Sequence, residues 1–203
     1  MADWNTGSFE DLYASVGDDL ARVPWARLGP YPMLVEWLDR RATTPGGRAL
    51  VVACGLGDDA EELGGRGYEV TAFDLSETAI SWCHRRFPDS PVDYQIADLL
   101  ELPREWAHRF DLVVEINTIQ SLPLAVRERT VSAIASTVAP GGALFVRCVG
   151  RADDEPVGSR PWPVSREELA VLEQGGLRET EFAEDFSEPA RRRWFQAVYE
   201  RIL

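Results

Sequence analysis

Short apolar runs alternate with amphipathic segments along most of the chain, the pattern typical of strands joined by helices. The apolar runs suit strands that are buried on both faces of a parallel sheet. Strands are predicted at 48–53, 68–73, 92–96, 110–116 and 143–148, and helices at 58–65, 77–86 and 123–138. Ser76 precedes one helix as an expected N-cap. With right-handed crossovers, this order predicts a Rossmann-like, doubly wound sheet.

The two ends of the chain extend this core. Residues 8–22 and 30–41 are predicted to be helices that form a cap. After Gly150, a polar loop is followed by a capped helix over 165–176 and by two strands, 177–186 and 191–203. The last two strands give an antiparallel ending, so we expect seven strands in all. We expect one domain over 1–203, with a helical cap at 1–44 and the core at 45–203.

Composition restricts the class of protein. The chain has 203 residues, of which 45% are hydrophobic and 27% are charged, as in ordinary globular domains. No apolar run approaches the length of a membrane span, and the acidic start is unlike a signal peptide. Three scattered cysteines predict reduced thiols and a cytoplasmic location. No cysteine and histidine spacing typical of metal ligands occurs, so no metal is expected.

Charge excludes further functions. The formal net charge is −13, which disfavours a nucleic-acid partner. The chain contains no lysine, so a lysine-dependent phosphate loop, a Schiff base and a lysine general base are all excluded. The two histidines, His84 and His108, lie in polar stretches and are expected on the surface.

The most informative segment is ALVVACGLGDDA, at 49–60. Its apolar run ends at Gly55 and Gly57, and Asp74 follows the next predicted strand. Glycine lets a backbone approach a ligand closely, and a carboxylate after the second strand accepts hydrogen bonds from ribose hydroxyls. The pattern therefore predicts a nucleoside site.

The segment 55–60 also fits a loose dinucleotide pattern, so a nicotinamide-dependent oxidoreductase is an alternative. A dinucleotide places its pyrophosphate at the helix N-terminus, where Asp58 and Asp59 stand in this chain. These carboxylates would repel a pyrophosphate and suit a ligand that carries an ammonium and a sulfonium. The remaining chain is also short for a second catalytic domain.

Five motifs in order resemble the class I S-adenosylmethionine-dependent methyltransferases, over about residues 45–203. They are VVACGLGD, FDLS, IADLLELP, FDLVVEINTIQSLP and VAPGGALFV. The family has an acid where this chain has Val51, and a first glycine where it has Ala53. The VPWARLGP segment resembles the cap of the thiopurine S-methyltransferase-like branch, whose members methylate small molecules.

The resemblance implies S-adenosylmethionine as the cofactor and assigns roles to residues. In the family, the counterpart of Asp74 binds the ribose and that of Asp98 binds the adenine amino group. The cofactor-binding residues implied are Ala53, Gly55, Gly57, Asp59, Asp74, Leu75, Asp98, Leu99 and Glu115. Asp58 or Asp59 is expected to take the role of the acidic residue that the family has at the position of Val51.

The substrate side is expected at 115–120, because ligands of open α/β sheets lie beyond the carboxyl ends of the strands. Glu115 and Asn117 are the candidate catalytic residues, and Gln120 is expected to contact the substrate. Alternatively, Glu115 fixes only the cofactor amino group or a helix turn. Tyr13, Trp25 and Trp162 are the candidate lid residues, with Trp162 on a mobile loop. Trp25 has the alternative of simply packing the cap onto the sheet.

The prediction is methyl transfer to an oxygen, nitrogen or sulfur nucleophile of a small molecule, without a nucleic-acid or membrane partner. Two alternatives remain: a non-catalytic S-adenosylmethionine-binding sensor or assembly protein, and the nicotinamide-dependent oxidoreductase.

Overall fold

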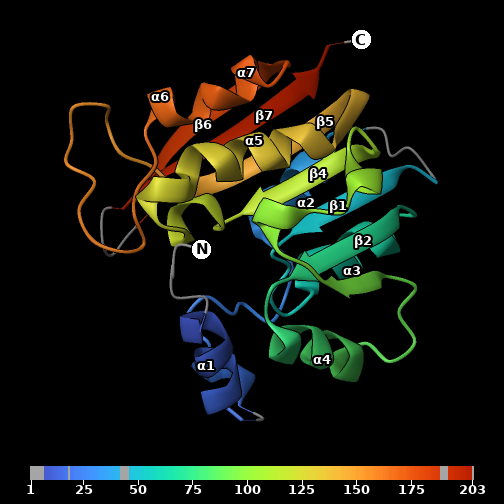
Figure 1. Cartoon of the computed structure of the whole chain (residues 1–203). Coiled ribbons are helices and arrows are strands. Elements are labelled where there is room, and N and C mark those ends of the chain that lie inside the picture. The colour runs from blue at the N-terminus through green and yellow to red at the C-terminus, as the bar shows by residue number, and fades with distance from the viewer. Residues whose placement is uncertain (1–6, 18, 42–45, 188–191, 203) are drawn as a thin grey trace. The chain divides into compact units, whose positions relative to one another are not determined.

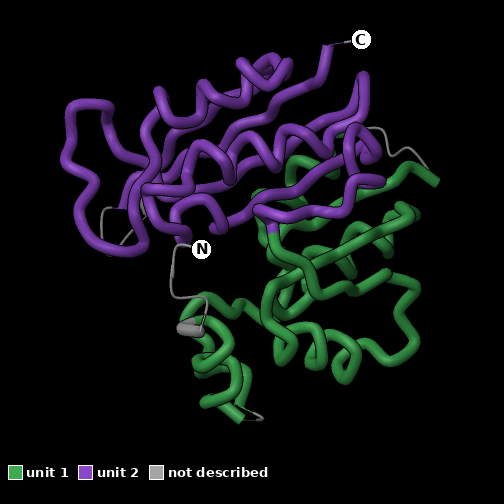
Figure 2. Tube along the Cα trace, viewed as in Figure 1, with its two compact units in different colours: residues 1–98 green, residues 99–203 purple. Residues whose placement is uncertain are grey.

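The computed structural model describes residues 7–17, 19–41, 46–187 and 192–202. The chain divides into two compact units, residues 1–98 and 99–203, which Figure 2 colours separately. The sequence placed a boundary near residue 44 instead, between cap and core. That boundary stays a prediction, and each unit is described by itself below. Residues 1–6, which precede the first predicted helix, lie outside the described residues.

Unit 1 is a parallel three-stranded sheet with helices around it (Figure 1). Its strands are β1 (Arg48–Val52), β2 (Glu69–Asp74) and β3 (Asp93–Ile96), and β2 pairs with both neighbours. Its helices are α1 (Gly7–Ser15), η1 (Leu20–Arg22), α2 (Pro32–Asp39), α3 (Asp58–Gly65) and α4 (Glu77–Arg86). The apolar positions of β1 are buried, which is why this run forms an interior strand.

Unit 2 contains four strands: β4 (Phe110–Ile116), β5 (Val138–Val149), β6 (Leu177–Ser187) and β7 (Arg192–Arg201). β4 and β5 are parallel, whereas β7 runs antiparallel to both β5 and β6. Its helices are η2 (Leu99–Glu101), η3 (Arg104–Trp106), η4 (Ile119–Ser121), η5 (Leu124–Val126), α5 (Arg127–Thr137), α6 (Arg166–Leu169) and α7 (Val171–Gln174).

The strand order is β3-β2-β1-β4-β5-β7-β6. The seven-stranded, mostly parallel Rossmann-like sheet with an antiparallel ending is therefore confirmed. Strand 110–116 and helices 58–65 and 77–86 have the predicted bounds.

Several predicted bounds were wrong. The first helix ends at Ser15 rather than at residue 22, because Gly17 has a φ of +58° and breaks the helical path. The helix predicted over 165–176 is two four-residue helices that meet at Ala170. The helix predicted over 123–138 begins as a 3-10 turn, and β5 starts at Val138, well before residue 143.

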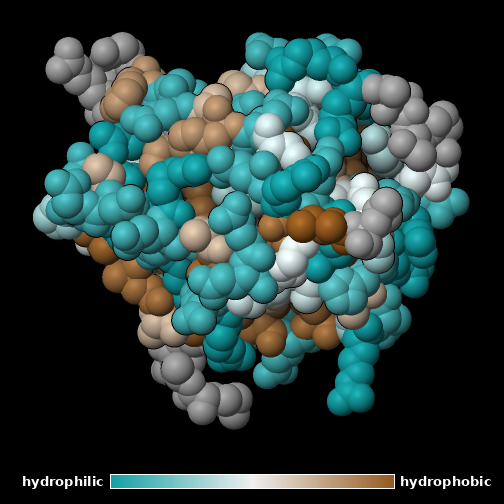
Figure 3. Space-filling view, turned by 90° about the horizontal axis from the view of Figure 1, so that it is seen from above, coloured by the Kyte–Doolittle hydropathy of each residue, from teal (hydrophilic) through white to brown (hydrophobic). Residues whose placement is uncertain are grey.

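The surface shown in Figure 3 is largely hydrophilic, with hydrophobic residues in separate patches. His84 and His108 are exposed, as predicted. Within the described residues, no helix has the length and apolarity needed to cross a membrane.

Candidate functional site

A strained turn links β1 to α3 in unit 1. Ala53, Gly55 and Gly57 have φ angles of +48°, +53° and +87°. A left-handed backbone favours glycine, so Gly55 and Gly57 suit this turn whereas Ala53 bears a steric cost. A Cβ atom on Gly57 would lie 2.6 Å from the Tyr94 hydroxyl oxygen, so this position has no room for a side chain. The turn thus lies at the carboxyl end of β1 with the Tyr94 side chain packed against Gly57.

Asp74, at the end of β2, fastens this turn. One carboxylate oxygen accepts a hydrogen bond from the Gly55 backbone N–H (3.0 Å), and the other accepts from the Ser76 N–H (2.9 Å). The side chain is only 8% exposed. Burial raises the pKa of Asp74, while the backbone hydrogen bonds act in the opposite direction. The structure therefore places the predicted ribose-binding carboxylate directly beside the glycine turn.

Asp58 and Asp59, in the first turn of α3, both have protein partners. Asp58 forms a two-pronged ion pair with Arg86 of α4, with N–O distances of 2.7 and 2.8 Å. Asp59 accepts a hydrogen bond from the Tyr31 backbone N–H at 2.7 Å. Burial raises the pKa of Asp59 to about 6, although this bond opposes the shift. Arg86 offsets the charge of Asp58, so the repulsion of a pyrophosphate is weaker than the sequence alone suggested.

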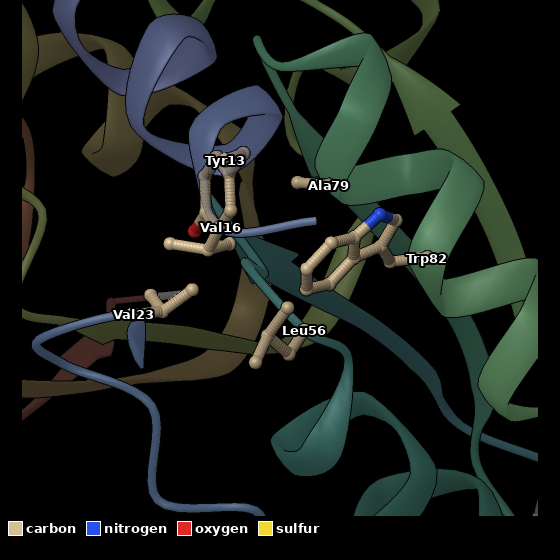
Figure 4. Packing of buried hydrophobic residues seen from close by; sticks show 6 residues of the cluster. All are labelled: Tyr13, Val16, Val23, Leu56, Ala79 and Trp82. Atoms are coloured by element: carbon tan, nitrogen blue, oxygen red, sulfur yellow. The ribbon is translucent and has the colours of Figure 1, made fainter. Parts of the chain in front are cut away.

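The N-terminal segment covers the glycine turn, as Figure 4 shows. Tyr13, Val16 and Val23 pack against residues of the turn and of α4. The six buried members of this cluster are Tyr13, Val16, Val23, Leu56, Ala79 and Trp82. The Tyr13 hydroxyl would lie 3.2 Å from a Cβ atom on Gly55. It also accepts a hydrogen bond of 3.0 Å from the Trp25 indole N–H. Two predicted lid residues thus lie together, with Tyr13 against the turn.

Glu10 of α1 joins this segment to the N-terminus of α4. Its carboxylate accepts hydrogen bonds from the Ser76 hydroxyl (2.5 Å), the Thr78 N–H (3.3 Å) and the Thr78 hydroxyl. Ser76 is the predicted N-cap of α4, and its hydroxyl oxygen accepts from the Ala79 N–H. A carboxylate at a helix N-terminus also interacts favourably with the helix dipole. Although burial alone raises the pKa of Glu10, its hydrogen bonds outweigh this and lower the pKa overall.

In unit 2, Glu115 of β4 is completely buried. Its Oε1 accepts hydrogen bonds from the Thr118 and Ile119 backbone N–H groups, at 2.6 and 3.1 Å. Its Oε2 has no hydrogen-bond partner in the described structure. Burial raises the pKa of Glu115 to about 7 against the effect of these bonds. The geometry matches the alternative in which Glu115 fixes a helix turn.

Asn117 and Gln120 follow β4 and contact each other. The Gln120 amide nitrogen donates to the Asn117 side-chain oxygen at 2.8 Å. The Gln120 amide oxygen accepts from the Val149 N–H at 3.1 Å, and its backbone oxygen accepts from the Trp162 N–H at 2.8 Å. Gln120 therefore connects the ends of β4 and β5 with the loop that carries Trp162.

Arg127 of α5 holds the same loop from the other side. This buried guanidinium donates to the backbone oxygens of Trp162 (2.8 Å) and Pro163 (3.1 Å), and pairs with Glu168 (2.9 Å). Glu168 also pairs with Arg151, at the start of the loop, at 3.1 Å. The backbone around Trp162 is thus anchored at several points, and the mobility of this loop stays a prediction.

The predicted site residues fall into two groups. Unit 1 brings together Tyr13, Trp25, Ala53, Gly55, Gly57, Asp59 and Asp74, whereas unit 2 brings together Glu115, Asn117, Gln120 and Trp162. Leu75, beside Asp74, is 41% exposed. Asp98 is half-buried as the last residue of unit 1, and Leu99, the first of unit 2, is buried.

Sequence reasoning missed Glu10, Arg86 and Arg127. The partners of Glu10 lie 66 and 68 residues away, and Arg86 lies 28 residues from Asp58. Local sequence contains no signal for such pairs, because each looks like an ordinary charge on a helix surface.

Residues 49–142 match the model of a protein family described as a methyltransferase domain. A curated relative, the ubiquinone biosynthesis O-methyltransferase of Aromatoleum aromaticum, is 34% identical over 122 residues, which are 59% of this chain and 51% of the relative. The chain thus spans about half the length of the curated relatives that it matches.

Solved structures share the fold over nearly the whole chain. The N-methyltransferase NodS from Bradyrhizobium japonicum, in complex with S-adenosyl-L-homocysteine, has a TM-score of 0.73 at 21% identity, covering 98% of this chain and 99% of that one. A protein described as the [4+2]-cyclase SpnF has a TM-score of 0.75 at 16% identity, covering 97% and 95%. At these identities the likeness concerns the fold.

Proposed function

We propose that this chain, a member of the class I S-adenosylmethionine-dependent methyltransferase superfamily, transfers a methyl group to an oxygen, nitrogen or sulfur nucleophile of a small molecule. The observation that carries the proposal is the fastening of the glycine turn by Asp74. Those residues lie within the segment that matches the methyltransferase domain. The matched relative, described as an O-methyltransferase of ubiquinone biosynthesis, supports a small-molecule acceptor.

The residues present fit the nucleoside part of S-adenosylmethionine. Gly55 and Gly57 give a turn without side chains of its own at these two positions, and Asp74 holds a carboxylate beside it. The Asp74 carboxylate accepts backbone hydrogen bonds from Gly55, Ser76 and Leu75, and a carboxylate has about four lone-pair sites, so capacity remains for a ribose hydroxyl. When bound, the cofactor supplies an electrophilic methyl group on a sulfonium.

The roles of this chain's own residues are positioning and exclusion of water. The segment with Tyr13 and Trp25 covers the glycine turn, so it would shield a bound ligand from solvent. Glu115 acts through the loop that it fixes, because its Oε1 is engaged by Thr118 and Ile119. We therefore assign Glu115 a positioning role and leave the general base, where an acceptor needs one, to other groups.

The first test is binding of S-adenosylhomocysteine, measured by calorimetry. We expect the wild-type chain to bind, and Asp74→Ala to weaken binding about 10- to 100-fold through the loss of charge-assisted hydrogen bonds. Asp89→Ala, at an exposed aspartate of the same unit, is the matched control and should bind like the wild type. No binding by the wild type would refute the proposal, and equal binding by Asp74→Ala would remove this residue from the site.

A second candidate is a protein that binds the cofactor without methyl transfer. A neighbour described as a [4+2]-cyclase has the same fold, so fold alone does not settle the reaction. Formation of S-adenosylhomocysteine from S-adenosylmethionine with a panel of small nucleophiles distinguishes the two. Binding without product across phenols, amines and thiols would favour the second candidate, and a parallel titration with nicotinamide dinucleotides tests the oxidoreductase alternative. The cytoplasmic location stays a prediction.

A further inference from the structure

A short chain of side-chain amides stands at the carboxyl end of β4. It runs from the Val149 N–H through Gln120 to Asn117. Gln120 is 3% exposed, and Asn117 is half-buried with a φ of +68°. Ligands of open α/β sheets bind beyond the carboxyl ends of the strands, so this is where an acceptor molecule is expected.

The direction of this amide chain is fixed by its backbone end. A backbone N–H can only donate, so the atom of Gln120 that faces Val149 at 3.1 Å must be its oxygen. The Gln120 NH₂ group then faces Asn117 and donates to it at 2.8 Å. The atom of Asn117 that receives this bond must therefore be its oxygen. The opposite assignment would place two donors against each other at the backbone contact.

The other polar groups of Asn117 have partners inside the protein. Its backbone N–H donates to the Arg147 oxygen at 2.9 Å, and its backbone oxygen accepts from the Ser121 hydroxyl at 2.7 Å. Within the described part of the chain, its side-chain NH₂ has no recorded hydrogen-bond partner. Asn117 thus offers two N–H donors that the described protein does not use, whereas one lone pair of its side-chain oxygen is taken by Gln120.

We propose that the Asn117 NH₂ group binds an oxygen atom of the methyl acceptor, and that Gln120 is the positioning residue that sets this polarity. The inference rests on the proposed methyl transfer and narrows its substrate class. The acceptor is a molecule with a carbonyl, carboxylate or phenolate oxygen within reach of Asn117. An ammonium group offers only donors, so this site disfavours it.

The first variant replaces the hydrogen-bond donor of the Asn117 side chain with an acceptor. Asn117→Asp keeps the oxygen that accepts from Gln120 and replaces the NH₂ group with a second oxygen. Aspartate tolerates the left-handed backbone nearly as well as asparagine, so the fold should be retained. Asn117→Gly, which also suits this backbone, removes the side chain and serves as the control without polarity.

The probes are small ions titrated into protein saturated with S-adenosylhomocysteine, with binding followed by NMR. Acetate and benzoate offer only acceptors, whereas methylammonium and benzylammonium of similar size offer only donors. We expect benzoate to shift the Asn117 NH₂ resonance of the wild type and to bind about tenfold more weakly to Asn117→Asp. Benzylammonium should show the reverse preference, and Asn117→Gly should discriminate between the two least. Equal affinity of benzoate for wild type and Asn117→Asp, or no response of the Asn117 resonance to either anion, overturns the proposal.

Gln120→Glu tests the positioning role without any ligand. At alkaline pH the introduced carboxylate can only accept, so Asn117 should rotate and donate its NH₂ group to that carboxylate. We expect the Asn117 NH₂ protons to exchange readily with water in the wild type and to become protected in Gln120→Glu. An unchanged exchange rate overturns the role of Gln120. This readout uses the ligand-free chain, so its failure is independent of the proposed methyl transfer. The proposed methyl transfer is tested separately, by the formation of S-adenosylhomocysteine from S-adenosylmethionine.

Discussion

At the scale of single residues, Gly57 is the position that tolerates change least in the glycine turn. Its φ of +87° lies in the left-handed region, and a Cβ atom would lie 2.6 Å from the Tyr94 hydroxyl oxygen and 3.1 Å from the Cys83 sulfur. Tyr94 cannot easily withdraw, because its hydroxyl donates to Glu61 at 2.6 Å. Backbone strain and steric overlap therefore act together.

Gly57→Ala should lower the free energy of unfolding by about 2 kcal/mol or more, measured by urea denaturation. The control is Gly65→Ala, at the end of α3, where a Cβ atom meets no atom within 4 Å. Alanine is a better helix former than glycine, so this control should be neutral or stabilising. Equal stability of the two variants would show that the turn relaxes easily.

The sequence predicted some contacts between residues of the site and missed others. The spacing of Gly55, Gly57 and Asp74 indicated a shared site, because strand ends and turns follow local rules. The pairing of Asp58 with Arg86 depends on how α3 and α4 pack, and no local rule encodes it. The sequence therefore overestimated how strongly Asp58 and Asp59 would repel a pyrophosphate, because it did not show the ion pair with Arg86.

At the scale of elements, α1 is attached to α4 mainly through one carboxylate and one hydrophobic cluster. Glu10 supplies the polar contacts to Ser76 and Thr78, and Tyr13 and Val16 supply the apolar ones. The covering of the glycine turn by α1 thus depends on a contact that a single substitution can remove.

Glu10→Ala should make the backbone amides of α1 exchange faster with solvent. We expect about a fivefold increase in rate for each 1 kcal/mol by which the substitution lowers the free energy of detaching α1. Exchange in β1 and β2 should stay unchanged, because their ladder does not involve Glu10. Asp11→Ala, at the exposed neighbouring residue of the same helix, is the matched control. Faster exchange in the control to the same extent would contradict a specific role for Glu10.

The hydrophobic periodicity of the sequence predicted which segments form helices and strands, but it predicted their first and last residues less accurately. Helices 58–65 and 77–86 have clear beginnings, after Gly57 and at the Ser76 cap. The start of β5 was misplaced, because Pro140 and two glycines look like a turn in sequence. In the structure they lie in an irregular stretch of β5, because the register with β4 passes from Val138 to Ala143. The strands that pair with β5 lie far away in the chain, which local propensity cannot reveal.

At the scale of the whole molecule, the net charge of −13 is a source of self-repulsion. Several carboxylates are paired with arginines, but acidic residues outnumber basic ones by 34 to 21. Repulsion between exposed carboxylates is screened by salt more strongly than the partly buried ion pairs are.

The melting temperature should therefore rise when sodium chloride is added to a dilute buffer, at neutral pH. Each 1 kcal/mol gained corresponds to about 2–4 °C for a chain of this size. Choline chloride at equal ionic strength should act similarly if screening is the cause. A fall in melting temperature with both salts would show that attractive ion pairs dominate instead.

The position of β7 between β5 and β6 has a consequence for synthesis on the ribosome. β6 leaves the exit tunnel before β7, yet β7 is the strand with which it pairs. Until β7 follows, the exposed hydrogen-bonding groups of β6 and its Phe182 and Phe186 have no sheet to join. A nascent chain held at this stage is therefore the form that most needs a chaperone.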